Sequence, residues 1–233
     1  MSHISRFERI ASVIGHPVML GAKILDFGCG KGAAEERAKG RDVFGCDIAS
    51  GLDSAPKDLI GGVLRAIDVS NYRIPFEDNE FDMVISHEVL EHVQNYESAL
   101  REIRRVLKPG GISIHIFPSR YTPIEPHVYV PLATIVRSMG WLKLWAHLGI
   151  RNEYQKRLPA IKVAELNHQY LQTYTNYLTK SELSHEFRKS FSTTLFVEKE
   201  FLAAGNRYGP LIAKLPLVPS LFGAFVQRVI ALA

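Results

Sequence analysis

Acidic residues recur at the ends of three short apolar stretches in the first third of the chain. Asp26 precedes a glycine-rich turn that contains Gly28 and Gly30, Asp47 follows 21 residues after Asp26, and Asp68 follows after another 21. Glycines allow a backbone to approach a ligand closely and to adopt positive φ. An acidic residue before such a turn would repel a phosphate but attract a ligand that carries a positive charge.

Each of the three acids suits a different part of one ligand. A carboxylate beside the turn suits an amino-acid group that bears an ammonium and a sulfonium. The carboxylate at the end of the second stretch can accept hydrogen bonds from both hydroxyls of a ribose, as in dinucleotide-binding enzymes. The third can meet the amino group of an adenine. Together they predict S-adenosylmethionine as the cofactor, with S-adenosylhomocysteine as its product.

A second class of cofactor also fits part of this pattern. The spacing of Gly28, Gly30 and Ala33 satisfies the looser dinucleotide fingerprint, with Asp47 at a suitable distance. An NAD(P)-dependent Rossmann oxidoreductase is therefore the main alternative, although the acids at 26 and 68 argue against it. A third alternative is a non-catalytic cofactor-binding interaction protein, which the intact set of glycines and acids disfavours.

The elements that position these residues alternate along the chain. A strand from Lys23 enters the turn, and further strands are predicted at 43–47, 61–69, 81–86 and 112–117. Helices are predicted at 5–14, 33–39 and 88–107. Strands alternating with helices indicate an α/β fold with a parallel sheet and right-handed crossovers. Ligands of such folds bind at the carboxyl ends of the strands, near the switch point of the strand order.

Four segments resemble the type 11 methyltransferase family of class I S-adenosylmethionine-dependent methyltransferases. They are residues 24–32 (ILDFGCGKG), 43–48 (VFGCDI), 74–93 (IPFEDNEFDMVISHEVLEHV) and 107–111 (LKPGG). The resemblance covers roughly residues 20–120. It implies a Rossmann-like, doubly wound, mostly parallel seven-stranded sheet with helices on both faces, followed by a helical C-terminal elaboration.

The resemblance also implies roles for the residues that match the motifs. The methionine portion would contact Asp26, Gly28 and Gly30, and the ribose and adenine would lie against Asp47 and Ile48. Asp68 and Val69, after the third strand, would bracket the adenine. Ser86 and His87, after the fourth strand, would close the site.

The acceptor side is less defined by sequence. Methyl transfer from an activated sulfonium depends mainly on proximity and orientation, and a general base is needed only if the acceptor must lose a proton. His87, after the fourth strand, and His127, on a proline-rich segment after the fifth, are the candidate catalytic residues. Glu91 and His92 fall within the helix predicted at 88–107 and are interpreted as structural.

Composition limits the remaining classes. A hydrophobic content of 46% and a charged content of 22% are ordinary for a globular chain and argue against disorder. No metal site is predicted, because Cys29 and Cys46 have no paired His or Cys at ligand spacing. No run of 18 apolar residues and no signal-peptide pattern occur, so the expected location is the cytoplasm.

Charge divides the chain into unequal halves. Residues 1–119 hold 14 Lys/Arg and 17 Asp/Glu, a net of −3, whereas residues 120–233 hold 14 and 7, a net of +7. The basic half is consistent with an anionic partner or with a solvated basic face. Nucleic acid is not expected, because no nucleic-acid-binding module accompanies the charge. The expected acceptor is a small molecule or a lipid- or glycan-linked intermediate.

Three regions are predicted: an N-terminal helix within 1–20, the cofactor-binding core at 21–120, and an acceptor-side or lid segment with C-terminal strands and a helix at 121–233. The last helix is placed at 221–232 with Ser220 as its cap. Its apolar face would pack on the sheet or on a second subunit. Alternatively, it would lie in the interface of a membrane as a peripheral contact.

Overall fold

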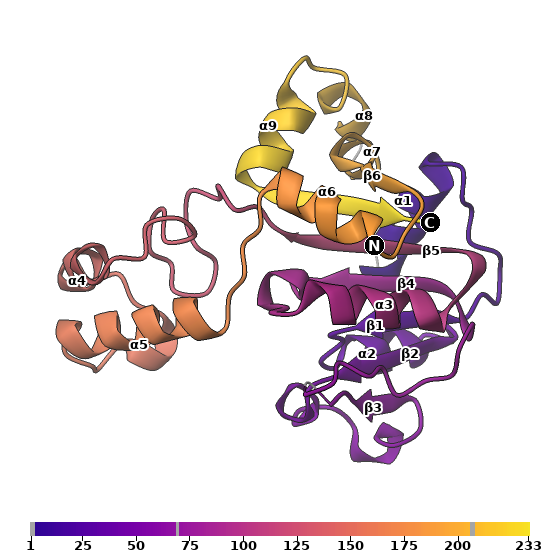
Figure 1. Ribbon diagram of the computed structural model, residues 1–233, viewed down its shortest axis with the longest axis horizontal. Coiled ribbons are helices and arrows are strands. Elements are labelled where there is room, and N and C mark those ends of the chain that lie inside the picture. The colour runs from indigo at the N-terminus through magenta and orange to yellow at the C-terminus, as the bar shows by residue number, and fades with distance from the viewer. Residues whose placement is uncertain (1–2, 69, 206–207) are drawn as a thin grey trace.

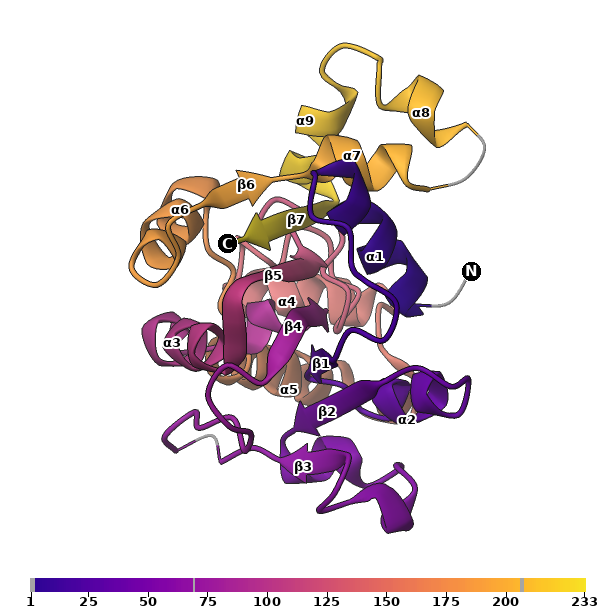
Figure 2. The same cartoon turned by 90° about the vertical axis from the view of Figure 1, so that its right-hand side faces the viewer.

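A seven-stranded sheet forms the centre of the molecule. The computed structural model describes residues 3–68, 70–205 and 208–233. The strand order is β3-β2-β1-β4-β5-β7-β6 (Figure 2). The first five strands are parallel, and β7 is antiparallel to both of its neighbours. The strands are β1 (Ile24–Phe27), β2 (Val43–Asp47), β3 (Leu64–Ala66), β4 (Phe81–His87), β5 (Leu107–Pro118), β6 (Thr194–Phe196) and β7 (Gln227–Leu232).

Helices cover both faces of this sheet. Figure 2 shows α1 and α2 on one side, and α3 and α6 on the other. The helices are α1 (His3–Val13), α2 (Gly32–Arg37), α3 (Tyr96–Val106), α4 (Met139–His147), α5 (Ala160–Thr173), α6 (Lys180–Arg188), α7 (Glu198–Ala203), α8 (Gly209–Ile212) and α9 (Val218–Phe225). The predicted Rossmann-like, doubly wound α/β fold is confirmed.

Burial explains why the first strands have nearly continuous apolar sequences. All four residues of β1 are buried, since helices cover both faces of a parallel strand. One core layer joins α1 to the sheet through Phe7 and Ile10. The other joins α3 and α6 to the opposite face through Leu100 and Phe187. This two-sided core fixes the carboxyl ends of the strands, where the site residues lie.

The helix predicted at 88–107 is shorter than expected. A single 3-10 turn, Leu90–His92, follows β4, and α3 begins only at Tyr96. The Asn95 side chain caps α3 by accepting a hydrogen bond of 3.0 Å from the amide of Ser98. Residues 88–95 are therefore a connection at the carboxyl end of β4. This connection carries Glu91 and His92, which the sequence interpretation had placed in a helix.

A helical cap projects from the carboxyl edge of the sheet. Its two helices, α4 and α5, lie to one side of the molecule, well away from α1 and α2 (Figure 1). A third apolar cluster is drawn entirely from this part of the chain and includes Val130, Leu142 and Leu171. Trp141 lies beside this cluster, where its indole N–H donates to the Pro131 carbonyl at 2.7 Å.

The prediction for the C-terminus is wrong in its secondary structure. The helix α9 ends at Phe225, and residues 227–232 form β7, hydrogen-bonded between β5 and β6. Ser220 lies inside α9 rather than at its cap. Val229, Ile230 and Leu232 are fully buried. A short apolar run fits a buried strand as well as a helix, so its periodicity could not decide between them.

The strands at the two edges of the sheet are the shortest. The strand predicted within 61–69 is β3, Leu64–Ala66, and the strand at the opposite edge is β6, Thr194–Phe196, which is followed closely by α7. An edge strand has a neighbour on one side only, so fewer backbone hydrogen bonds hold it in place. Among the described residues, no helix has the length and apolar character required to cross a membrane.

Candidate functional site

The turn between β1 and α2 opens at the switch point of the strand order, because β1 lies between β2 and β4. Gly28 and Gly30 both have positive φ, +76° and +47°. A Cβ atom on Gly28 would lie 2.3 Å from Cγ2 of Val89. Gly28 is therefore required because the connection after β4 passes directly over it. The space around Gly30 is open.

Asp47 fixes the shape of this opening. Asp47 is the last residue of β2. Its Oδ2 accepts a hydrogen bond of 2.7 Å from the amide of Gly30, and its Oδ1 accepts one of 2.7 Å from the amide of Ile48. The carboxylate thus joins the turn to the end of β2 and retains lone pairs on both oxygens. Beside it, Ile48 exposes 45% of its surface, which leaves an apolar wall at the mouth of the turn.

Asp26 supplies buried negative potential beneath the turn. The residue is 4% exposed. Burial, followed by the negative charges of Asp47 and Glu36, raises the pKa of Asp26 to about 7. A buried carboxyl group with two acidic neighbours favours a cationic ligand over an anionic one. The structure therefore brings Asp26, Gly30 and Asp47 together, as the sequence predicted, and gives them the charge expected of a site for an ammonium-bearing ligand.

Asp68 has a different local role. Its carboxylate accepts hydrogen bonds from the amide and hydroxyl of Ser70, at 2.9 and 2.6 Å, and from the side-chain amide of Asn71, at 3.1 Å. The bonds from Ser70 hold its pKa below the usual range. The side chain shapes the turn after β3. Val69, its predicted companion, lies outside the described residues.

Ser86 and His87 differ in their access to the site. Ser86 is fully buried, and its hydroxyl bonds to Nδ1 of His115 at 2.8 Å, so its side chain belongs to the sheet interior. Burial lowers the pKa of His115 to about 3, so this histidine is a neutral packing residue of the sheet interior. His87 is half-buried at the carboxyl end of β4. Burial lowers the pKa of its imidazole, with a smaller contribution from Arg6 of α1.

On the acceptor side, Glu125 organises the segment after β5. It is fully buried, and its Oε1 is 2.7 Å from Nδ1 of His127 and accepts a bond of 2.7 Å from the Tyr177 hydroxyl. Its Oε2 accepts hydrogen bonds from the backbone N–H groups of His127 and Val128. Burial opposes a charge on His127, but the contact with Glu125 outweighs burial and raises the pKa of His127.

The second candidate histidine lies next to residues that sequence reasoning set aside. The rings of His92 and His127 are 4.7 Å apart at 70°, and Tyr170 is 5.6 Å from His127. Glu91 is 1% exposed, and burial raises its pKa to about 8. The signal available in the sequence was positional, since the Glu-His pair follows β4 and Glu125 and His127 follow β5, both at carboxyl ends.

An open cavity of about 680 Å³ adjoins this group. Aromatic rings and amide side chains dominate its wall. The lining residues are Pro126, His127, Val128, Tyr129, Asn152, Glu153, Tyr154, Gln155, Leu166, Asn167, Gln169, Tyr170 and Tyr174. Such a wall can stack against a ring and hydrogen-bond to hydroxyl groups. All of the lining residues fall within 126–174, the part of the chain that forms the cap.

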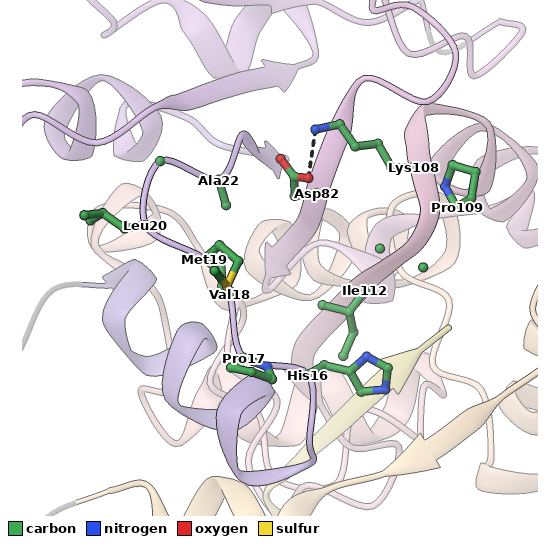
Figure 3. Close-up of a pocket in the computed structure, with 13 residues that line it drawn as sticks. His16, Pro17, Val18, Met19, Leu20, Ala22, Asp82, Lys108, Pro109 and Ile112 are labelled. Carbon is green, nitrogen blue, oxygen red and sulfur yellow. Dashed lines mark hydrogen bonds and ion pairs between the residues drawn. The ribbon is translucent and has the colours of Figure 1, made fainter.

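A second cavity, of about 400 Å³, lies at the amino ends of the strands. Figure 3 shows it beside the amino end of β4, where Lys108 pairs with Asp82 at 2.8 Å. Ligands of doubly wound sheets bind at carboxyl ends. This cavity is therefore on the wrong side of the sheet for the residues described above.

The strand order, its switch point and the acidic glycine turn fit the Rossmann-like arrangement that the sequence predicted. Residues 25–115 match the sequence model of the type 11 family, which is described as a methyltransferase domain.

Two curated relatives share about half of the chain. A sterol 24-C-methyltransferase of Gibberella zeae is 40% identical over 119 residues, which cover 47% of this chain and 30% of the relative. A demethylmenaquinone methyltransferase of Staphylococcus aureus is 33% identical over 120 residues, covering 48% of this chain and 50% of the relative. The chain thus spans half or less of the length of these two relatives.

Solved structures extend the likeness in fold to almost the whole chain. A putative methyltransferase in complex with the Haloferax volcanii Trm112 activator aligns with a TM-score of 0.50 at 17% identity, covering 98% of this chain and 90% of the other. Phosphoethanolamine N-methyltransferase 2 of Haemonchus contortus aligns at 0.52 and 16% identity, covering 98% and 52%. At these identities the likeness concerns the fold alone.

Proposed function

We propose that the chain is an S-adenosylmethionine-dependent methyltransferase that binds its donor at the β1–α2 turn. The observation that carries this proposal is the arrangement of Asp47, which bridges Gly30 and Ile48 beside the buried Asp26. The two carboxylates suit the ribose hydroxyls and the ammonium of the donor. An NAD(P)-dependent oxidoreductase is not favoured, since the family match and the curated relatives are methyltransferases.

The chain's own residues would act mainly by placing the reactants. The donor already carries an activated methyl group, so holding an acceptor in line with the sulfonium supplies much of the rate enhancement. The connection after β4 joins the donor turn, where Val89 covers Gly28, to the acceptor cavity, where the ring of His92 meets that of His127. His87 is the last residue of β4, directly before this connection. His127 and Tyr170, at the inner wall of that cavity, are the proposed contacts for the acceptor.

The cavity wall favours an acceptor with a ring and several hydroxyl groups. Among the described residues, two of its buried amide atoms, Oδ1 of Asn152 and Nδ2 of Asn167, have no hydrogen-bond partner. Tyr129, Tyr154 and Tyr174 expose half or more of their surfaces around the opening. Unsatisfied amides and exposed tyrosines are suited to a sugar ring, so we place a glycan-linked acceptor ahead of an unadorned small molecule.

A lipid attachment on that acceptor is supported by the apolar surface of the α8–α9 segment. Leu211, Leu217 and Leu221 expose 66%, 72% and 52% of their surfaces, and residues 201–233 contain no Asp or Glu. The chain after α9 contacts the start of the segment that leads from β5 into the cap, where the amide of Ser119 donates to the Val226 carbonyl. An exposed apolar surface without acidic residues suits an anionic lipid surface.

A labelling experiment tests the acceptor class. Purified protein is incubated with methyl-labelled S-adenosylmethionine and separate cell fractions of glycolipids, soluble metabolites and nucleic acids. We expect label in the glycolipid fraction, and no label with Asp47→Ala. Label confined to soluble metabolites would overturn the lipid attachment. Label in nucleic acid, or transfer that is equal in Asp47→Ala, would overturn the proposed acceptor or the proposed donor site.

Sedimentation with anionic vesicles tests the surface separately. We expect the wild-type chain to pellet with vesicles and the double variant Leu217→Ser, Leu221→Ser to remain in the supernatant. Leu148→Ser is a matched control, since Leu148 is also exposed but lies at the end of α4. If the wild type stays in the supernatant, the surface does not bind lipid.

A further inference from the structure

Three residues with metal-ligating side chains converge beside the acceptor cavity. Glu91 and His92 belong to the 3-10 turn after β4, and His127 follows β5. One ligand atom from each lies within 4.8 Å of the other two. The two imidazole rings lie edge to face, 4.7 Å apart at 70°, rather than stacked.

The hydrogen bonds of the two histidines leave one ring nitrogen of each available. Nδ1 of His92 is 2.7 Å from the carbonyl oxygen of Tyr174, which can only accept, so Nδ1 carries the proton and Nε2 carries the lone pair. Nδ1 of His127 is 2.7 Å from the Glu125 carboxylate, and the same reasoning leaves Nε2 unprotonated in the neutral ring. A metal-binding histidine typically donates its other N–H to a carbonyl or carboxylate.

Glu91 provides an independent indication of a missing ligand. Its side chain is fully buried, and neither carboxylate oxygen has a hydrogen-bond partner among the described residues. Nε2 of His92 lies 3.9 Å from Oε1, beyond hydrogen-bond distance. Buried polar groups are almost always satisfied, and buried charges are paired or coordinate a metal. A cation between Glu91 and the two histidines would satisfy all three side chains.

We propose that Glu91, His92 and His127 bind one divalent transition-metal ion, with zinc as the first candidate. Two imidazoles and one carboxylate form a familiar set for zinc with an open position. At zinc-to-ligand distances of about 2.1 Å, ligand atoms lie roughly 3.4 Å apart, so the side chains must close by at most about 1.4 Å from their present separations of 4.8 Å or less.

Neighbouring contacts hold the ligands in place. The amide of Asn176 donates to the Glu91 carbonyl at 2.6 Å, and its side chain donates to the Val93 carbonyl at 2.9 Å. The segment that leads from α5 to α6 therefore fixes the 3-10 turn that carries Glu91 and His92. Glu125 fixes the third. The open coordination positions would face the cavity that His127 and Tyr170 line, where an oxygen atom of the acceptor can bind.

The role of the ion rests on the proposed function, but its binding can be measured without the methyl donor. Chelator-treated, full-length protein is titrated with Zn²⁺ by calorimetry, and with Co²⁺ followed by visible absorption. We expect one equivalent to bind, with a Kd of about 1 μM or tighter. The Co²⁺ bands should be those of a four- or five-coordinate site.

Variants identify the ligands. Glu91→Gln and His127→Ala should abolish stoichiometric binding, and Glu125→Gln should weaken it roughly 10- to 100-fold. His147→Ala should bind normally, because His147 is an exposed histidine on α4. Binding of S-adenosylhomocysteine by each variant reports that it is folded. No zinc binding by the wild type, or full binding by Glu91→Gln, would overturn the site while leaving the donor site intact.

Discussion

The carboxylate of Asp47 has the most specific contacts at the donor turn. It accepts hydrogen bonds from the amide N–H groups of Gly30 and Ile48 and retains further lone pairs on both oxygens. Asp26 lies beneath it in a buried position and has a raised pKa. In the proposed donor site, Asp47 would position the ribose hydroxyls and Asp26 would provide negative charge for the ammonium. Both roles can be tested one residue at a time.

Replacing Asp47 should weaken donor binding. In Asp47→Ala, the ribose hydroxyls lose a charged acceptor, and the affinity for S-adenosylhomocysteine should fall by roughly 1.5–3 kcal/mol, or about 10- to 150-fold. Calorimetry measures this directly. Asp58→Ala is the matched control, because Asp58 is exposed in the connection between β2 and β3. Equal affinities for Asp47→Ala and the wild type would place the ribose elsewhere.

The raised pKa of Asp26 predicts that donor affinity depends on pH. The ligand's ammonium favours the ionised carboxylate, so binding should release a proton when Asp26 starts protonated. With a pKa of about 7 in the free chain, affinity should rise roughly five- to tenfold between pH 6 and pH 7.5. Calorimetry in buffers of different ionisation enthalpy detects the proton. If the affinity of the wild type does not change with pH, so that its pH profile matches that of Asp26→Asn, this role of Asp26 is contradicted.

The same carboxyl group should limit the stability of the free chain. Its pKa is higher in the folded state, so its favourable contribution is complete below the ordinary value of 3.8 and is lost as pH rises through about 7. Asp26→Asn should therefore raise the Tm at pH 8 and change it little at pH 4. Thermal unfolding followed by circular dichroism gives both values. A lower Tm for the variant at pH 8 would show that Asp26 is stabilising when ionised.

At the scale of elements, the C-terminal strand shows how the sheet is completed. The strand β7 inserts between β5 and β6, and its central residue Ile230 pairs with His115 and Phe196. Ile230→Ala should lower the free energy of unfolding by about 2–5 kcal/mol, because it removes fully buried side-chain volume. Leu221→Ala, on the exposed part of α9, should change it by less than about 0.5 kcal/mol. Urea denaturation compares the two, and equal effects would contradict the buried strand.

The elements that the sequence predicted well are those built from local βα units. The strand before Gly28 and the strand before Asp47 each combine an apolar run with a turn of characteristic residues, so their type and position could be inferred. The segment 227–232 lacks such a local marker. Its strand conformation depends on hydrogen bonds to β5 and β6, which periodicity cannot show.

At the scale of the whole molecule, the donor and acceptor sides differ in how they are assembled. The donor turn is formed by Asp26 and Asp47, which lie on β1 and β2. These two strands are neighbours in the sheet and also follow one another in the sequence. The acceptor side joins the connection after β4 to the cap, where Glu91 meets His127. That contact depends on how the cap folds back onto the sheet edge. Sequence position alone indicated His127 but assigned its neighbours Glu91 and His92 to a helix.

The measurement that most directly tests the central claim is calorimetry of the wild-type chain with S-adenosylhomocysteine and, separately, with NADH. The geometry of Asp26, Gly30 and Asp47 predicts one site for S-adenosylhomocysteine with a Kd in the micromolar range, about 8 kcal/mol at 1 μM, and no saturable binding of NADH. Tight binding of NADH, with no heat from S-adenosylhomocysteine, would contradict the assignment of this turn to a methyl donor.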